Sequence, residues 1–379
     1  MRASFDIAVL PGDGVGAEIT PPALAIAEAA LQATGGPTLR TRTHPAGETL
    51  LHQTGTALPD TTWRACEAAD AILLGPMGLQ DPRCGHCRVG DVPEFHGPAV
   101  APRLDLCSTL DLYADLRPVR AIPGVPTPLG SADAARIDCA IVYAPVDDPS
   151  PSDNPGVGGG PAGEGRTRTC GERISRFALE TALRRRKAGR KPTVTLMDAP
   201  GAGPLREALG EVANAYPAVA AVPMDVDAGM PAFVGKPWLL DVVLTEAPFG
   251  GVLANLAAGL VGGLWFAPTA CVGDVHAAFQ PAHGAAAEIM DTGRANPTAA
   301  ILSAAMMLDW LGHRHDLPAS VEAAVLIGRA VDSAFADDGL RTCEHGGSAG
   351  VRDITGAVLD HLRHSTTPTV ATPTAPPLL

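Results

Sequence analysis

Short apolar runs alternate with longer stretches of helical periodicity along most of the chain, and this alternation predicts an α/β fold. The runs have the length and the β-branched content of buried strands. The strands predicted in this way cover residues 6–10, 69–75, 137–144, 194–197 and 242–245. Several of the intervening stretches are long enough for helices, so we expect a layered arrangement of helices around a sheet.

The beginning of the chain predicts a strand, a glycine turn and a helix, because residues 6–10 are followed by PGDGVGAE and then by the apolar stretch 21–33. Such an order is common in nucleotide-binding folds. However, Gly12, Gly14 and Gly16 do not have the G-x-G-x-x-G spacing that places a pyrophosphate at a helix N-terminus. A dinucleotide fingerprint is therefore not established by this turn.

A second informative stretch joins a polar loop to a helix. Pro297 stands at a position typical of a helix start, and residues 298–308 are apolar too continuously for a surface helix, so this helix should be buried. The loop before it carries four residues that could hydrogen-bond an adenosine-like ligand or simply satisfy a tight loop. They are His283, Gly284, Glu288 and Asn296.

Two segments have compositions that oppose regular structure. Residues 145–165 consist almost entirely of Pro, Gly, Ser, Asp and Asn, which predicts a flexible excursion. The Thr/Pro-rich residues after Leu362 predict a disordered tail. The stretch 247–273 has no charged residue and could span a bilayer by length, but its glycines and prolines interrupt it. We expect one short helix there, at 252–260, with the small residues of a tight helix interface.

The net charge of -13 argues against nucleic acid and anionic membranes as partners, because both are negatively charged. Small molecules and proteins are the partners that we expect. No signal peptide is predicted, and we expect a cytoplasmic protein. The eight cysteines are too dispersed for a disulfide framework. Cys84 and Cys87 could form a redox dithiol or part of a zinc site, or could lie in an ordinary loop. Residues 346–350 fit the G-x-S-x-G pattern of serine hydrolases but lack the preceding buried strand.

Five motifs, in this order, carry a family resemblance: IAVLPGDGVGAEI, LDLYADLRPVRAIPG, PAHGAAAEI, GRANPTAAILSAAMML and GGSAGVRDITGAVLDHL. The chain resembles the β-decarboxylating isocitrate/isopropylmalate dehydrogenases, and most closely their 3-isopropylmalate branch. The resemblance implies a large domain from both chain ends (1–105 and 251–363) and a small domain from the middle (106–250), with a shared central sheet and a short disordered tail (364–379). It also implies a homodimer through residues 250–264 and an active site between the domains.

The resemblance also implies a reaction, for which this chain lacks most of the groups. Relatives oxidise a 2-hydroxy acid with NAD and decarboxylate it on Mg²⁺ or Mn²⁺ held by three aspartates. Of these aspartates only Asp227 is matched, while Gly251 and Asn255 stand at the other two positions. Ala199 stands at the position of the family's lysine, and its tyrosine has no counterpart.

The substrate side is reduced in the same way. Of three arginines that clamp the substrate, Arg117 is matched, Cys107 replaces the second, and the third has no clear counterpart at 143–146. Asp198, Asp227 and Glu246 lie in or beside segments that line the family's cleft, so a relocated metal or acid site is a further hypothesis.

The cofactor side is matched better. His283, Gly284 and Asn296 match the family's adenosine-binding loop, and Glu288 stands where NAD-specific relatives have an aspartate. The leading hypothesis is thus a divergent homologue of NAD-dependent 3-isopropylmalate dehydrogenase without the family reaction. The alternatives are a catalytically silent protein that binds a dinucleotide or a partner, and a true dehydrogenase of leucine biosynthesis.

Overall fold

One ten-stranded sheet runs through the computed structural model, which describes residues 2–78, 102–145, 164–185, 191–199 and 203–365. The strand order is β2-β1-β3-β10-β9-β4-β5-β8-β6-β7. The strands are β1 (Ser4–Leu10), β2 (Thr38–Thr43), β3 (Ala71–Leu74), β4 (Ala114–Arg120), β5 (Asp138–Tyr143), β6 (Thr193–Asp198), β7 (Ala220–Asp225), β8 (Val242–Thr245), β9 (Pro268–Val272) and β10 (Ala277–Pro281). The α/β class predicted from the sequence is confirmed.

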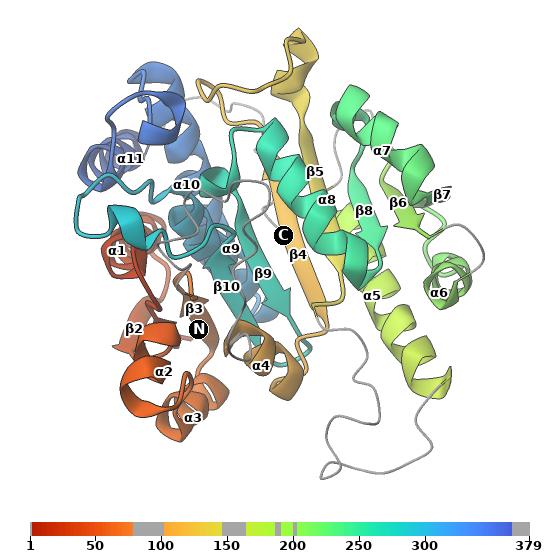
Figure 1. The fold of residues 1–379 in the computed structure, drawn as a ribbon, viewed down its shortest axis with the longest axis horizontal. Coiled ribbons are helices and arrows are strands. Elements are labelled where there is room, and N and C mark those ends of the chain that lie inside the picture. The colour runs from red at the N-terminus through yellow and green to blue at the C-terminus, as the bar shows by residue number, and fades with distance from the viewer. Residues whose placement is uncertain (1, 79–101, 146–163, 186–190, 200–202, 366–379) are drawn as a thin grey trace, which may run out of the picture.

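Eleven α-helices lie in the described ranges and cover the sheet (Figure 1). They are α1 (Gly16–Thr34), α2 (Glu48–Thr54), α3 (Asp60–Ala68), α4 (Pro102–Thr109), α5 (Glu164–Arg184), α6 (Pro204–Ala213), α7 (Val226–Gly235), α8 (Ala247–Leu260), α9 (Thr298–Arg314), α10 (Pro318–Asp337) and α11 (Val351–Ser365). Short 3-10 turns include η3 (Pro237–Leu239), η4 (Leu264–Phe266), η5 (Ala287–Ile289) and η6 (Cys343–His345).

The sheet is built from different parts of the chain on its two sides. Strands β2, β1, β3, β10 and β9 come from residues 4–74 and 268–281, whereas β4, β5, β8, β6 and β7 come from residues 114–245. The two sets meet where β9 pairs antiparallel with β4. This order agrees with the shared sheet that the resemblance implies, while the domain boundaries at 105 and 250 stay a prediction.

Helices cover opposite faces of the middle-chain half. Val242 and Leu244 of β8 belong to the hydrophobic cluster that includes α5, whereas Val243 belongs to the cluster that includes α8. Successive side chains of a strand point to opposite faces, so α5 and α8 lie on opposite sides of the sheet. Figure 1 shows α8 lying across β4, β5 and β8.

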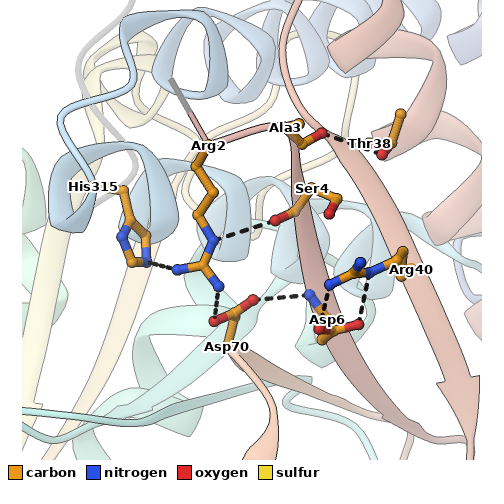
Figure 2. Close-up of polar contacts among 8 residues, drawn as sticks. All are labelled: Arg2, Ala3, Ser4, Asp6, Thr38, Arg40, Asp70 and His315. Carbon is orange, nitrogen blue, oxygen red and sulfur yellow. Dashed lines mark hydrogen bonds and ion pairs between the residues drawn. The ribbon is translucent and has the colours of Figure 1, made fainter.

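The predicted strands are present as β1, β3, β5, β6 and β8, but five others were not predicted. The clearest case is β2, whose sequence TLRTRT is polar and almost fully exposed at the sheet edge. Polar contacts hold it in place of apolar burial (Figure 2): Arg40 donates to both carboxylate oxygens of Asp6, at 2.9 and 2.6 Å. Beside it, Asp70 accepts from the Asp6 backbone N–H at 2.8 Å and pairs with Arg2.

The helix predicted from Pro297 is confirmed as α9, and every residue from Thr298 to Gly312 in it is buried. It packs against β9 and β10 of the sheet and against α1 and α10. The predicted helix at 252–260 is present as α8, but it begins five residues earlier, at Ala247, and β9 follows it. Within the described ranges, no helix is long and apolar enough to span a membrane.

Two segments predicted to be irregular have other bounds than predicted. Helix α5 already begins at Glu164, inside the segment 145–165, of which residues 146–163 lie outside the described ranges. Helix α11 continues to Ser365, past the predicted start of the tail after Leu362, whose side chain is buried. Cys84 and Cys87 also lie outside the described residues. The 3-10 turn η6 precedes Gly346, so no buried strand leads into the G-x-S-x-G pattern.

We expect Gly250→Ala to lower the free energy of unfolding by about 1–3 kcal/mol, the usual cost of overpacking. Gly250 lies in the first turn of α8 under the buried Tyr143, and a Cβ there would lie 2.1 Å from Cγ of the ring. Urea denaturation at a fixed protein concentration measures this change. Gly251→Ala is the matched control, because a Cβ there meets nothing within 4 Å, and it should stabilise by up to about 1 kcal/mol. Equal effects of the two substitutions would contradict the expectation.

Candidate functional site

A buried carboxylate lies at the centre of the sheet, on the strand that joins its two halves. Asp115 of β4 is fully buried, and Arg103 of α4 and Arg117 of β4 both pair with it. The Arg117 Nε donates to Oδ1 at 3.3 Å. Burial alone would raise the pKa of Asp115, but the two guanidiniums outweigh it and hold the pKa below its usual value. Asp115 is therefore an anion at neutral pH.

Tyr143 and Asn255 complete this group, which we call the Asp115 cluster (Arg103, Asp115, Arg117, Tyr143 and Asn255). Tyr143 lies directly opposite Asp115 in the β4–β5 register and donates a hydrogen bond to its carboxylate. Burial raises the pKa of Tyr143, so its hydroxyl stays neutral. Arg117 lies over the Tyr143 ring at 5.6 Å, and its Nη1 is 3.5 Å from Oδ1 of the exposed Asn255 on α8.

Two buried thiols adjoin the cluster. Nη2 of Arg103 lies 2.9 Å from Sγ of Cys271 on β9, and Cys107, one helical turn after Arg103 on α4, forms a hydrogen bond with Cys271. Burial raises the pKa of Cys271 well above its usual value. The Cys271 thiol is therefore neutral, and the charged groups of the cluster are the two arginines and Asp115.

Sequence reasoning identified Arg117 but missed Arg103 and Asp115. Two signals could have found them. Asp115 and Arg117 are two residues apart, so they would share one face of any strand there, although the hydrophobic pattern predicts no strand at this place. Arg103 precedes Cys107 by four residues, so both lie on one face of a helix. The sequence does not show that α4 directs Arg103 toward β4, because no local pattern specifies how that helix packs.

The metal positions do not come together as a cation site. Asp227 is exposed in the first turn of α7, Gly251 offers no side chain, and Asn255 accepts from Arg117. In the part of the chain that the structure describes, no three His, Cys, Asp or Glu side chains are grouped to hold a metal. These residues therefore do not fit a hard divalent cation, which prefers several carboxylate oxygens.

The hypothesis of a relocated metal or acid site is not supported either. Asp198 is buried, and Arg206 donates to both of its carboxylate oxygens, at 3.0 and 2.5 Å. The same guanidinium also reaches Asp225 at 2.9 Å. Asp198, Asp227 and Glu246 form no three-donor group. At the lysine position, the exposed Ala199 has only a methyl group and cannot transfer a proton.

The predicted cofactor loop is ordered around two buried residues and two exposed ones. Asn296 is buried: its amide donates to Glu344 at 2.8 Å, and its Oδ1 accepts from the Thr298 N–H at 3.0 Å at the start of α9. Gly284 and Glu288 are exposed. The part of the loop open to a ligand is therefore Gly284 to Glu288, while Asn296 anchors the loop to the helix.

His283 is enclosed beside this open part. Its ring stacks on Trp265 at 3.9 Å, and its Nδ1 donates to the Gly284 carbonyl at 2.9 Å. Burial lowers the pKa of His283 to about 4, so the imidazole is neutral. With Nδ1 protonated, Nε2 is an acceptor, and it has no hydrogen-bond partner in the described structure.

The glycine turn after β1 supports the cofactor loop directly. The Val15 N–H donates to the Ala285 carbonyl at 2.8 Å. Gly14 has a φ of +53°, and a Cβ there would lie 2.0 Å from the same carbonyl oxygen. Only glycine allows this approach. The turn therefore serves loop packing, which explains why its spacing differs from a pyrophosphate fingerprint.

Comparisons with known proteins agree with this arrangement. Residues 6–358 match the family model "Isocitrate/isopropylmalate dehydrogenase". A 3-isopropylmalate dehydrogenase of Salinibacter ruber is 36% identical over 352 residues, covering 90% of each chain. An isocitrate/homoisocitrate dehydrogenase of Thermus thermophilus is 34% identical over 383 residues, covering 95% of this chain and 99% of the relative.

Solved structures show the same fold. The crystal structure of isocitrate dehydrogenase from Methylococcus capsulatus has a TM-score of 0.72 and 28% identity, covering 96% of this chain and 100% of that one. A β-decarboxylating dehydrogenase from Thermococcus kodakarensis has a TM-score of 0.70 and 28% identity, covering 95% and 96%. By its sequence over nearly the whole length and by its fold, this chain belongs to the isocitrate/isopropylmalate dehydrogenase family.

Proposed function

We propose that the chain is a divergent member of this family that binds NAD(H) and a small organic acid but does not carry out metal-dependent oxidative decarboxylation. One observation carries the proposal. Asn255, at a position where the resemblance implies a metal-binding aspartate, presents an amide that accepts from the Arg117 guanidinium. That contact puts a positive charge where the family reaction needs a divalent cation.

The charge balance around Asn255 strengthens this argument. Asp115 is the buried carboxylate that Arg117 also contacts. Both of its ion pairs are with arginines, so it is not available as a metal ligand. Gly251 and Ala199 add no donor. Without a cation, the alcohol of the substrate would not be acidified and the enolate charge would not be offset. We therefore infer that both chemical steps of the family reaction are lost.

The proposal for the cofactor rests on the other side of the molecule. The neutral His283 and the exposed Gly284 and Glu288 leave one edge of the loop open to a nucleotide. A carboxylate at Glu288 suits two free ribose hydroxyls and opposes a 2′-phosphate. NAD is therefore the expected dinucleotide. A cytoplasmic location stays a prediction.

Two alternatives remain as outcomes of the experiments. A silent protein that binds only a partner would bind no dinucleotide. A true 3-isopropylmalate dehydrogenase, which the identity of 36% to such an enzyme brings to mind, would turn over its substrate. Both outcomes are readily measured.

The purified protein should not reduce NAD with 3-isopropylmalate and Mn²⁺. Each missing acid–base or metal group ordinarily supplies at least ~10²-fold of rate. The readout is the absorbance of NADH at about 340 nm, and a family dehydrogenase is the positive control. Turnover above ~1 s⁻¹, an ordinary value for enzymes, would overturn the proposal.

NADH should bind more tightly than NADPH. Glu288→Ala should weaken the binding of NADH and so reduce the difference in affinity between the two dinucleotides. The reason is that Glu288 is exposed on the loop, so its carboxylate can accept from both ribose hydroxyls. Calorimetry measures both affinities, and Glu344→Ala, which removes the partner of Asn296, reports the effect of loosening the loop alone. Absence of NADH binding up to ~1 mM, a weak affinity on any scale, would favour the silent-partner alternative.

The protein should be a homodimer. Residues 250–264 carry no charge, and six of the 14 residues of α8 are buried within one subunit, whereas Val252 is 62% exposed. Leu239 of η3 is 56% exposed, and its element shares a hydrophobic cluster with α8. Val252→Asp should shift sedimentation toward the monomer, since charge opposes burial. A monomeric wild type at micromolar concentration would contradict this.

A further inference from the structure

We propose that Arg103 of α4 and Arg117 of β4 bind one carboxylate of a small acid, and that Asp115 limits this site to a single negative charge. The ligand class is a monocarboxylic acid with a neutral remainder. This inference rests on the proposed function, because it names the acid that would occupy the same site. It assigns a role to Arg103, which stands at no position that the family resemblance implies.

The first step is the net charge of the cluster. Two guanidiniums face one carboxylate, and Tyr143 and Cys271 are neutral. The remaining charge is therefore one positive unit. The Arg103 and Arg117 side chains are only 17% and 13% exposed, so this charge is poorly solvated. An uncompensated charge in such a place is costly, and one bound anion would neutralise it.

The second step is the set of donors left for a ligand. Arg103 uses Nη2 for Asp115 and Cys271, and Arg117 uses Nε for Asp115 and Nη1 for Asn255. The other guanidinium nitrogens bond to no described residue, and none of them is among the enclosed atoms that lack a partner. These N–H groups are therefore available to a carboxylate, for which guanidinium geometry is well suited.

The third step explains why a dicarboxylate is disfavoured. Two negative charges would exceed the single net positive charge, and the second would lie in the field of the buried Asp115. Among the described residues, the neighbouring positions supply no further guanidinium, since α4 carries Cys107 and β5 carries Tyr143 there. The Tyr143 ring lies beside Arg117, at 5.6 Å, and packs against Gly250. A neutral remainder of the ligand suits contact with this ring.

A pair of acids that differ by one carboxylate tests the proposal. The probes are 2-hydroxy-4-methylpentanoate and 3-isopropylmalate, and the measurement is calorimetry on the full-length protein with saturating NADH and without metal. We expect the monocarboxylate to bind at least about tenfold more tightly, a typical effect of one unfavourable charge at a partly buried site. Equal or tighter binding of 3-isopropylmalate would overturn the proposal, and so would the absence of binding by either acid at ~10 mM, beyond which affinity is negligible.

Substitutions separate the role of each charge. Arg103→Met should weaken the binding of the monocarboxylate at least about tenfold. Arg103→Lys keeps the positive charge but loses the planar guanidinium, so it should weaken binding less. Arg136→Met is the matched control, because Arg136 lies on an exposed turn and pairs with Asp133. It should change the affinity less than about twofold, as expected for an exposed ion pair remote from the site.

Asp115→Asn supplies the decisive reversal. Removing this negative charge raises the net charge of the site from one to two positive units. The affinity for 3-isopropylmalate should therefore rise at least about tenfold relative to the affinity for the monocarboxylate. If the variant does not fold, the Arg103 pair of substitutions still decides the question. An unchanged preference in folded Asp115→Asn would refute the charge limit. This outcome is separate from the activity test, because turnover with Mn²⁺ would refute the proposed function whichever acid binds more tightly.

Discussion

The buried carboxylate of Asp115 fixes the arrangement of the middle of the molecule. Removing a carboxylate from water costs several kcal/mol, and only close cationic and hydrogen-bonding partners offset this. Arg117 is supplied by the same strand, but Arg103 must come from α4, so α4 has to lie against β4. Tyr143 must reach the same carboxylate from β5, and its ring then requires glycine at position 250 of α8. One charge therefore constrains two strands and two helices.

A second constraint acts on the cofactor side and is steric. The loop that carries His283 and Glu288 packs on the glycine turn after β1. There the backbone of Gly14 lies too close to the Ala285 carbonyl for any Cβ. On its other side, Asn296 ties the loop to the start of the buried helix α9. The loop therefore depends on the glycine turn after β1 and on the start of α9.

The sequence predicts these two regions unequally, for physical reasons. Buried strands and the helix α9 leave a strong pattern, because continuous apolar runs have few other structures open to them. The edge strand β2 leaves none, since it is stabilised by Arg40 and Asp6, which are adjacent only after β1 and β2 have paired. Arg103 and Asp115 are similar: twelve residues separate them, and their contact depends on where α4 docks. Motif resemblance identified Arg117 and the loop, because those residues stand in recognisable local sequences.

The two halves of the sheet come from different parts of the chain but share one hydrophobic cluster. The strands beside the cofactor loop come from the chain ends, and the strands beside the Asp115 cluster come from the middle of the chain. Only the β9–β4 pairing joins them. Ala199, Gly251 and Asn255 lie beside the strands of the second half and take no part in the contacts that hold Asn296 or Gly14, whereas Cys107 bonds to Cys271 of β9 in the first half. The proposed loss of the metal and proton-transfer groups would therefore leave in place the contacts of the loop that carries His283 and Glu288. The proposed carboxylate site, with one net positive charge, would favour recognition of an acid over its decarboxylation.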